Sequence, residues 1–452
     1  MNQYMPEITV IMPTLNVRQY VEECIESVLS QTFQDFEALI IDAGSDDGTE
    51  EIIAQYEKRD LRVRAVHSER KSYGYQVNLG ISMARGKYIS IIEADDYIDK
   101  EMFLELYQKA EEHALDFVKA DNYNFVELDC GDIWKSRFYS GDTRLYNTVI
   151  EPATHRELHM SDIFIWKGLY NKELLRKNGI KLNESPGAAF QDAGFLFQTI
   201  GYAKRIMYLD RAFYYYRQDN SSSSIFNRKG FSYLVGEYQY IYEKLGGSGI
   251  WKEIEPYYYC RLFMQVNGRI RTMAASGEIW REAMEDVGRL RQILASASER
   301  HLFDEYILDE AAWTELQMFL ADHETYIQTK MTLYSMKRKW LQNLYDKISG
   351  YDTVVFYSCS NVGKFVDCLL GRAGIKKTVV FCDNNSRKWG TLFSGKKVCS
   401  VEEAVSRFKN AVYIIANRQY SREMREQLLK LGVGCRDIVQ YRLGCDVLNL
   451  QL

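Results

Sequence analysis

Hydrophobic and polar positions follow two alternating periods over the first 125 residues. Apolar runs of strand type, such as Ile8–Met12, Phe36–Ile41 and Lys87–Ile92, are separated by segments such as Val17–Leu29, where apolar residues recur every three or four positions. Strands that alternate with helices of about 10–14 residues form β-α-β units and a mostly parallel sheet. The pattern therefore predicts an α/β domain in which ligands bind outside the carboxyl ends of the strands.

The pattern changes twice further along the chain. Residues 127–228 mix short strands, turns and a polar serine tract at 219–224, whereas residues 230–347 have helical spacing and no chemical motif. Strand and helix alternation resumes at Gly350 for about 100 residues, a usual size for an independent core. We therefore expect an α/β domain over 1–228, a helical connector over 229–348 and a small α/β domain over 349–452.

Composition and charge narrow the class of protein. The 452 residues are 46% hydrophobic and 26% charged, which is ordinary for globular domains and argues against disorder. With 57 Lys+Arg against 62 Asp+Glu the net charge is -5, so no global positive field points to nucleic acid. No apolar run reaches the roughly 18–20 residues of a spanning helix, and the N-terminus lacks a secretory signal pattern. We expect a cytoplasmic protein with no transmembrane segment and no nucleic-acid partner.

Three carboxylates stand together in Glu93-Ala94-Asp95-Asp96, directly after an apolar strand. Like charges at this spacing repel one another, and a hard divalent cation relieves the repulsion. Mg²⁺ or Mn²⁺ held by one or two carboxylates and by substrate phosphates is the usual arrangement. The alternative is a solvated acidic turn before the helix expected at 100–113, and the motif alone does not decide between them.

A second polar segment, Asp42–Thr49, follows the strand at 36–41. Acidic residues at strand ends bind the base or ribose in nucleotide-binding α/β domains, so Asp42 is a candidate for that contact. For Ser45–Thr49 we favour a Gly/Asp-rich turn that leads into a helix. Pro13-Thr14-Leu15, after the first strand, is a weaker signal because proline commonly ends a strand.

Other metal and nucleophile motifs are missing from the sequence. The nine cysteines include no Cys-x-x-Cys pair, which argues against a zinc or dithiol site. His155 and His159 are spaced i, i+4 but lack the adjoining glutamate of a zinc motif, and we interpret both as surface residues. The chain has neither a G-x-S-x-G nucleophile motif nor a phosphate-binding P-loop.

Several motifs, in order over roughly residues 1–125, resemble those of family 2 glycosyltransferases with the GT-A fold. They are Ile11–Asn16, Ile25–Phe33, Asp42–Thr49, Asn78–Ile81, Ala84–Ile89 and Glu93–Asp96. Segments 165–170, 186–192 and 216–222 look like the acceptor side of that family. The segment 349–452 resembles small Rossmann-like modules appended to some bacterial sugar-processing proteins. The resemblance implies a GT-A type sheet flanked by helices, followed by the helical region and the Rossmann-like domain.

The resemblance also implies an activity. It is the inverting transfer of a sugar from a nucleotide-diphosphate sugar, with a UDP-sugar favoured, to a hydroxyl of a glycan or lipid-linked acceptor in surface polysaccharide assembly. Mn²⁺ or Mg²⁺ is the implied cofactor, with Asp95 as its ligand, and Asp192 is the implied catalytic base. The implied nucleotide-binding residues are Pro13, Thr14, Leu15, Asp42, Glu93 and Ala94.

Three further residues are candidates for contacts with the donor. Tyr73 precedes Gly74, and a glycine lets the backbone approach a ligand closely, so this segment is expected beside the donor sugar together with Asn78. Arg217 is a candidate for a second positive contact with the diphosphate, with an exposed loop arginine as the alternative.

Two residues depart from the family's pattern. Glu93 stands where the family has the first aspartate of D-x-D, and Gln191 stands where a glutamate commonly precedes the base. These departures leave open a catalytically inactive protein that binds sugar nucleotides. A nucleotidyltransferase-like enzyme is a further alternative, but it needs a basic triphosphate loop after the first strand, which residues 13–18 do not offer.

The motifs leave open the function of the C-terminal segment, residues 349–452. Asp383 stands where a ribose-binding acid is found in dinucleotide-binding domains, but only one glycine of G-x-G-x-x-G is matched, so a structural or homo-oligomer-forming module is the default interpretation. Met336–Trp340 is basic and aromatic and is a candidate for peripheral membrane contact, although an ordinary solvated helix face is favoured.

Overall fold

The structure is a computed structural model that describes residues 5–127, 133–220, 227–417 and 419–444. The expected serine tract therefore lies outside the described residues from Ser221 onward. The chain divides into two compact units, which are described separately. The first comprises Met1–Asn124, Arg137–Ile270 and Trp280–Tyr326, and the second comprises Phe125–Ser136, Arg271–Ile279 and Ile327–Leu452.

The first unit carries most of a mixed sheet that has nine strands in the described part of the chain, in the order β3-β2-β1-β4-β8-β6-β9-β5 with β7 paired to β6. The end of β6 and most of β7 belong to the second unit. Its parallel half consists of β3 (Val63–His67), β2 (Phe36–Asp42), β1 (Ile8–Thr14) and β4 (Tyr88–Ile91). Its other strands are β8 (Gly168–Asn171), β6 (Phe117–Glu127), β9 (Ile206–Arg217), β5 (Tyr97–Ile98) and β7 (Ile133–Phe138). The pairs β4–β8, β6–β8 and β5–β9 are antiparallel.

Side chains of β1 alternate between the two faces of this sheet, as the period of a strand requires. Ile8, Val10 and Met12 belong to the core on one face, whereas Ile11 belongs to the core on the other. Because both faces are covered, β1 is buried along its whole length, which explains its continuous apolar run. The predicted α/β class is therefore present.

Helices cover the two faces of the sheet. The core shared with Ile8 includes residues of α1 (Val21–Leu29), α2 (Thr49–Arg59) and α4 (Met102–His113). The core shared with Ile11 includes residues of α3 (Tyr73–Met83), α5 (Lys172–Lys177) and α6 (Gln191–Tyr202). In α1 the buried residues Val21, Cys24, Ile25 and Val28 recur every three or four positions, as expected for an amphipathic helix.

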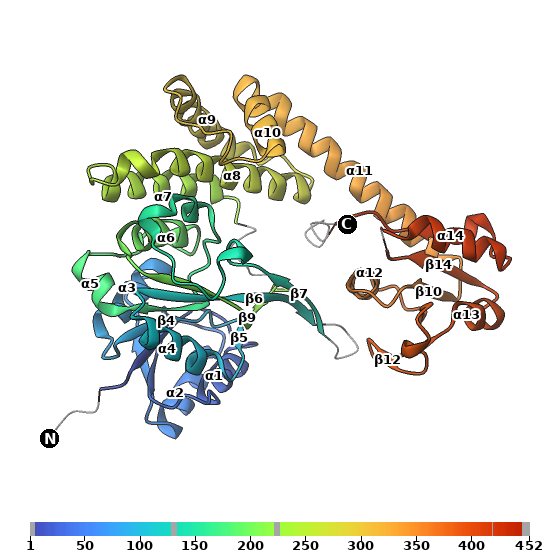
Figure 1. Cartoon of the computed structure of the whole chain (residues 1–452), viewed down its shortest axis with the longest axis horizontal. Coiled ribbons are helices and arrows are strands. Elements are labelled where there is room, and N and C mark those ends of the chain that lie inside the picture. Colours follow the sequence, from blue (N-terminus) through green and yellow to red (C-terminus); the bar gives the residue numbers. More distant parts are fainter. Residues whose placement is uncertain (1–4, 128–132, 221–226, 418, 445–452) are drawn as a thin grey trace. The chain divides into compact units, whose positions relative to one another are not determined.

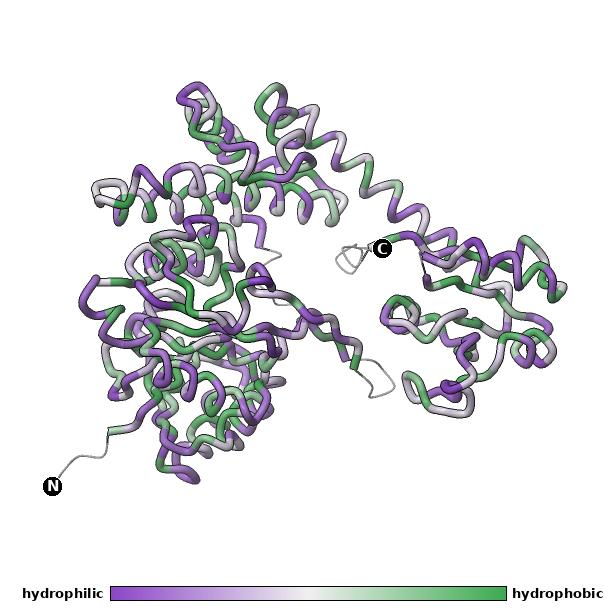
Figure 2. Tube along the Cα trace, viewed as in Figure 1, coloured by the Kyte–Doolittle hydropathy of each residue, from purple (hydrophilic) through white to green (hydrophobic). Residues whose placement is uncertain are grey.

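Further helices follow β9. They are α7 (Gly230–Leu245), α8 (Trp251–Ser276), α9 (Met284–Glu299), α10 (Glu310–Ala321) and α11 (His323–Ser349). Helix α7 packs on α6 (Figure 1). Figure 2 shows hydrophobic and hydrophilic residues alternating along α8 and α11, each of which begins in the first unit and ends in the second. None of the helices in the described ranges is long and apolar enough to cross a membrane.

The second unit contains a separate sheet, six-stranded within the described residues, in the order β12-β13-β11-β10-β14-β15. The strands are β10 (Thr353–Tyr357), β11 (Thr378–Cys382), β12 (Leu392–Phe393), β13 (Lys396–Cys399), β14 (Ala411–Ile415) and β15 (Ile438–Gln440). Its helices are α12 (Asn361–Arg372), α13 (Val401–Arg407) and α14 (Ser421–Lys430). The core of this unit also includes Val126 and Trp134 from the β6–β7 hairpin.

Asp383, the candidate ribose-binding acid of the second unit, is hydrogen-bonded to neighbouring residues. Oδ2 of Asp383 accepts hydrogen bonds from the backbone N–H of Cys359 at 3.0 Å and from Nζ of Lys388 at 2.7 Å. Its Oδ1 accepts the backbone N–H of Asn385 at 2.9 Å. These contacts explain the presence of an aspartate at position 383: its carboxylate stabilises the turn after β11.

Candidate active site

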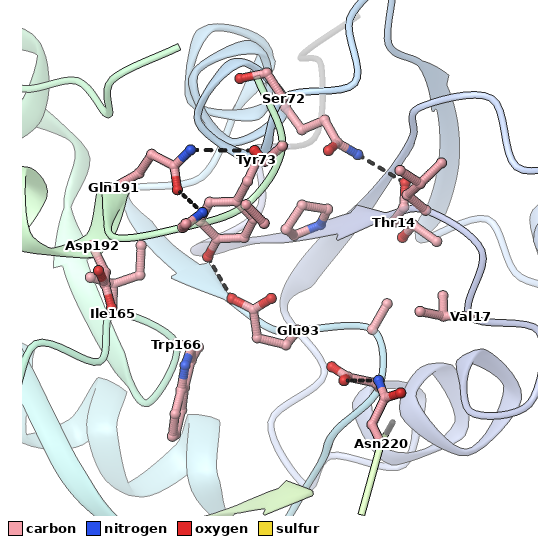
Figure 3. Close-up of a pocket in the computed structure, with 18 of the residues that line it drawn as sticks. Thr14, Val17, Ser72, Tyr73, Glu93, Ile165, Trp166, Gln191, Asp192 and Asn220 are labelled. Carbon is pink, nitrogen blue, oxygen red and sulfur yellow. Dashed lines mark hydrogen bonds between the residues drawn. The ribbon is translucent and has the colours of Figure 1, made fainter. Parts of the chain in front are cut away.

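A cavity of about 470 Å³ lies in the first unit, beyond the carboxyl ends of β1 and β4. It is lined by the end of β1 and the residues after it at 13–17, by residues 71–73 and Gln76 at the start of α3, and by the acidic turn at 93–95. The remaining wall comes from residues 164–166, the loop and first turn of α6 at 187–192, and residues 216, 217, 220 and 227. Segments far apart in the sequence thus meet at the sheet edge where α/β folds bind ligands (Figure 3).

The acidic turn after β4 is held in place by β9. The hydroxyl of Tyr214 accepts the backbone N–H of Glu93 at 3.1 Å and donates to Oδ2 of Asp96 at 2.7 Å. Asp96 also accepts the backbone N–H of Arg217 at 2.8 Å and is only 1% exposed. Asp96 is therefore a structural acid that orients the turn, which leaves Glu93 and Asp95 facing the cavity.

Glu93 is linked to the first residue of α3. The hydroxyl of Tyr73 donates a 2.5 Å hydrogen bond to Oε1 of Glu93. Burial raises the pKa of Glu93 to about 8, the Tyr73 hydrogen bond opposes this rise, and the nearby charges of Asp95 and Asp192 add to it. The cavity thus concentrates negative charge, and a cation placed in it would favour the ionised form of Glu93.

Asp95 lies next to Glu93 and is held through one oxygen. Its Oδ2 accepts Nδ2 of Asn220 at 2.7 Å, while Oδ1 has no hydrogen-bond partner among the described residues. No group of three or more His, Cys, Asp or Glu able to hold a metal occurs in the described ranges. One or two carboxylates with substrate phosphates suffice for Mg²⁺, so Asp95 and Glu93 fit a cation that shares its ligands with a diphosphate.

Asp192 reaches the cavity from the first turn of α6. Its Oδ1 accepts the backbone N–H of Ala193 at 2.9 Å. Burial raises the pKa of Asp192 to about 7, against the opposing effects of that N–H and of the Arg261 and Lys119 charges. In Figure 3, Asp192 and Glu93 lie on either side of the space bounded by Tyr73 and Trp166.

Gln191 orders the loop that leads to Asp192. Its Oε1 accepts the backbone N–H of Ala189 at 2.7 Å, and its Nε2 donates to Oγ of Ser185 at 3.0 Å and to the carbonyl of Gly187 at 3.3 Å. A glutamate has no N–H to donate, so the glutamine at this position builds a loop contact that the common family residue cannot make.

The expected nucleotide side of the cavity is formed by the end of β1 and the residue that follows it. Pro13, Thr14, Leu15 and Ala94 all line the cavity. Gln76 of α3 holds this region together, since its Nε2 donates to the carbonyl of Thr14 at 2.9 Å and to that of Ile41 at 2.6 Å. Gln76 could not be predicted from the sequence, because a single glutamine in a helical pattern carries no signal of a contact with two strand ends.

Two candidate nucleotide and donor residues do not line the cavity. Oδ2 of Asp42 accepts the backbone N–H groups of Gly44 and Ser45, both at 2.9 Å, and its Oδ1 accepts Oγ of Ser45 at 2.5 Å, so the structure places this carboxylate inside its own turn. Asn78 binds the backbone of Leu182 twice at 2.9 Å, through both of its amide atoms. Asn78 thereby fastens α3 to the segment before α6.

The expected reason for a glycine at position 74 is wrong. A Cβ at Gly74 would lie 1.9 Å from the carbonyl oxygen of Asn183, so the missing side chain admits a neighbouring backbone segment and not a ligand. Tyr73 itself does line the cavity, as expected.

Arg217 lines the cavity but its guanidinium is largely enclosed. Nε donates to the carbonyl of Asp95 at 3.0 Å and Nη2 to Glu23 at 2.6 Å, and the group lies 4.6 Å from the centre of the Tyr20 ring. Its side chain is 3% exposed, which excludes the alternative of an exposed loop arginine.

An aromatic wall completes the cavity. Phe164 and Trp166 stack with ring centres 4.7 Å apart, and Tyr216 lies 5.0 Å from Trp166 and 5.6 Å from Phe164. All three residues line the cavity. The resemblance places 165–170 and 216–222, and so Trp166 and Tyr216, on the acceptor side, but the stacking of these rings with Phe164 could not be predicted from the sequence.

Sequence comparisons with known proteins identify the family of the chain. The family profile described as Glycosyl transferase family 2 matches residues 9–177. The chain is 32% identical over 276 residues to the uncharacterized glycosyltransferase EpsJ of Bacillus subtilis, which covers 57% of this chain and 75% of the relative. It is 32% identical over 224 residues to the glycosyltransferase GlyG of Streptococcus pneumoniae, with 48% of this chain and 72% of the relative covered.

Solved structures show the same fold. Residues 1–349 of TarS from S. aureus match with a TM-score of 0.52 and 18% identity, over 74% of this chain and 91% of that chain. The same fragment in complex with UDP-GlcNAc matches with a TM-score of 0.52 and 19% identity, over 74% and 92%. The family profile, together with two relatives that are 32% identical and matched over about three quarters of their length, shows that the chain belongs to glycosyltransferase family 2 and is a glycosyltransferase.

Proposed function

We propose that this glycosyltransferase moves a sugar from a nucleotide-diphosphate sugar, with a UDP-sugar favoured, to a hydroxyl of an acceptor glycan or lipid-linked glycan, with inversion at the anomeric carbon. A divalent cation, Mn²⁺ or Mg²⁺, would assist the reaction. Surface polysaccharide assembly from the cytoplasmic side is the setting that we propose. TarS, which shares the fold, has been crystallised with UDP-GlcNAc, which favours a UDP-sugar as donor.

One observation carries the proposal: acidic groups lie on two sides of a single cavity. Glu93 and Asp95 come from the turn after β4, whereas Asp192 comes from the first turn of α6 (Figure 3). A single displacement needs charge stabilisation at the leaving diphosphate and a base on the opposite face of the sugar. The two acidic groups supply both requirements.

The leaving-group side is formed by Asp95 with Glu93. Both carboxylates offer the hard oxygen ligands that Mg²⁺ and Mn²⁺ prefer. When bound there, the cation would neutralise charge that develops on the diphosphate as the glycosidic bond breaks. Pro13, Thr14 and Leu15, at the end of β1, are the residues that we propose for contacts with the nucleoside.

The acceptor side is formed by Asp192. Its carboxylate would remove the proton of the acceptor hydroxyl while the hydroxyl oxygen bonds to the anomeric carbon and the bond to the diphosphate breaks. The products are the lengthened glycan and a nucleoside diphosphate, with the proton left on Asp192. A pKa near 7 suits a general base, because half of the carboxylate is then ionised at neutral pH.

The aromatic wall supports a sugar as the acceptor. Phe164, Trp166 and Tyr216 all line the cavity, where the buried Trp166 ring supports the partly buried rings of Phe164 and Tyr216. The C–H face of a pyranose would pack against these partly buried rings. We therefore propose that the acceptor's terminal residue is a sugar that lies along this wall, with its free hydroxyl directed to Asp192.

A thermal-shift screen tests the proposal. UDP, GDP, CDP and TDP are each added with Mn²⁺, Mg²⁺ or EDTA to the wild type and to Asp95→Ala. A ligand at a concentration 100 times its Kd raises the free energy of unfolding by about 2.7 kcal/mol, which produces a measurable shift in the melting temperature. We expect UDP with a divalent cation to stabilise the wild type, and this shift to be lost in EDTA and in Asp95→Ala.

The other outcomes bear on the alternatives. Nucleotide binding without turnover of any donor would favour an inactive protein that binds sugar nucleotides. A shift that persists in EDTA and in Asp95→Ala would contradict the proposed site and direct attention to the second unit around Asp383.

A further inference from the structure

Glu237 of α7 is a buried carboxylate that contacts the first turn of α6 from outside the cavity. Its side chain is 1% exposed. Oε1 accepts the backbone N–H of Gly194 at 3.0 Å, and Oε2 accepts Nδ2 of Asn183 at 3.0 Å. At the start of α6 the backbone N–H of Ala193 donates to the carbonyl of Phe190 at 2.9 Å, whereas the next N–H, that of Gly194, donates to Glu237. Glu237 therefore binds a backbone donor two residues after Asp192.

The fit between Glu237 and α6 is close. A Cβ at Gly194 would lie 2.3 Å from Oε1 of Glu237, so the carboxylate occupies the space of the side chain that glycine lacks. No lysine or arginine forms a salt bridge with Glu237 in the described part of the chain, and both of its partners are neutral amides. The carboxylate therefore serves as a hydrogen-bond acceptor that joins two backbone segments.

The second of these segments leads to the donor side of the cavity. Asn183 follows Leu182, whose backbone is bound twice by Asn78 of α3. Helix α3 begins at Tyr73, which holds Glu93. A continuous series of contacts thus connects the turn that carries Asp192 with the helix that carries Tyr73. In this series Glu237 is the residue that binds both the α6 turn, through Gly194, and the segment before α6, through Asn183.

We propose that Glu237 is a positioning residue for the transfer reaction: by joining Gly194 to Asn183, it fixes the Asp192 carboxylate relative to the Tyr73–Glu93 pair. This inference rests on the proposed function of Asp192. It also gives α7, in the helical region that carries no chemical motif, a defined part in the active site.

The test compares Glu237→Ala with Glu237→Gln and with Glu255→Ala as a matched control. Glu255 is a buried glutamate of α8 that pairs with Arg300 at 2.9 Å and contacts no residue of α6 among its hydrogen bonds. In Glu237→Gln the amide oxygen still accepts from Gly194, and Asn183 can rotate its own amide to match. The measurements are kcat and KM for nucleoside diphosphate release, the Kd for UDP, and hydrogen exchange of the amides at 192–195.

We expect Glu237→Ala to lower kcat at least tenfold, because small misplacements of a catalytic group have large effects on rate. The KM for the donor and the Kd for UDP should stay within twofold of the wild type. Glu237→Gln should keep kcat within threefold, and Glu255→Ala should leave kcat unchanged. Exchange of the Gly194 amide should accelerate at least tenfold in Glu237→Ala and in neither of the other two variants.

Retention of kcat in Glu237→Ala, or an equal loss in Glu255→Ala, would overturn the inference. Failure of the proposed function is recognised separately, by a wild type that turns over no donor. In that case the exchange measurement still decides whether Glu237 holds the first turn of α6: faster exchange supports the positioning contact, and unchanged exchange overturns it.

Discussion

The hydroxyl of Tyr73 donates a 2.5 Å hydrogen bond to Oε1 of Glu93, and both residues line the cavity. The bond connects the start of α3 with the turn after β4, two segments that the sequence separates by about twenty residues. It favours the ionised form of Glu93, whereas burial disfavours that form. Tyr73 therefore controls both the position and the charge of an acid on the proposed leaving-group side.

Replacing Tyr73 with phenylalanine tests this relationship. The variant loses a hydrogen bond to a carboxylate, a class of interaction that contributes about 1.5–3 kcal/mol, and a tenfold change in affinity corresponds to about 1.4 kcal/mol. We expect the affinity for UDP with Mn²⁺, measured by calorimetry, to fall about tenfold. Tyr75→Phe is the matched control, since Tyr75 does not line the cavity, and equal affinities in the two variants would contradict the assignment.

The stability of Asp192→Asn should depend on pH. Burial raises the pKa of Asp192 from 3.8 to about 7, so the folded state favours the protonated acid. The contribution of the protonated Asp192 to the free energy of unfolding is fully present below pH ~4 and is lost as the pH rises through 7. Asparagine does not ionise, so we expect the variant to melt at a higher temperature than the wild type at pH 8, with a free energy of unfolding higher by an amount on the order of 2–4 kcal/mol.

Comparing the melting of wild type and Asp192→Asn again at pH 4.5 checks the direction of this pH dependence. There the wild-type acid is protonated in the folded state and the advantage of Asp192→Asn should largely vanish. Asp46→Asn, which alters an exposed aspartate, should show no such difference between the two pH values. A melting difference for Asp192→Asn that is independent of pH would rule out this account of the buried carboxyl.

Gly74 and Gly236 form a matched pair of helical glycines. A Cβ at Gly74 would lie 1.9 Å from the carbonyl oxygen of Asn183, whereas a Cβ at Gly236 meets no atom within 4 Å. We expect Gly74→Ala to lower the free energy of unfolding by more than 2 kcal/mol through overpacking. Gly236→Ala should raise it by about 0.5–1 kcal/mol through helix propensity. Urea denaturation measures both, and a neutral Gly74→Ala would contradict the packing of α3 against Asn183.

Residues at strand ends could be predicted from the sequence. Glu93 and Asp95 follow an apolar run, and Pro13–Leu15 follow another, so the general rule for α/β sheets was enough to bring them to one edge. Asp192 was assigned only through resemblance, since nothing local in residues 186–192 indicates that they face the acids of the first domain. The structure brings all of these residues to one cavity.

Contacts at long range could not be predicted. Gln76, Glu237 and Asp96 are polar residues whose partners lie on other elements, and their sequence surroundings are those of ordinary helices and turns. His159, which was expected at the surface, is fully buried, so that prediction is wrong. Its ring packs 5.1 Å from that of Phe197, and burial lowers the pKa of His159 to about 4. The i, i+4 spacing with His155 gave no sign of this burial.

The role of Asp192 as the base is tested by nucleoside diphosphate release from UDP-sugars, with Mn²⁺ and a glycan acceptor, in wild type and Asp192→Asn across pH. We expect kcat/KM of the wild type to rise with pH and to level off above about 7, as Asp192 ionises. We expect Asp192→Asn to lose about 10²–10⁴-fold in kcat, while its Kd for UDP is unchanged. Wild-type turnover in Asp192→Asn, with the same pH profile, would show that another group removes the proton.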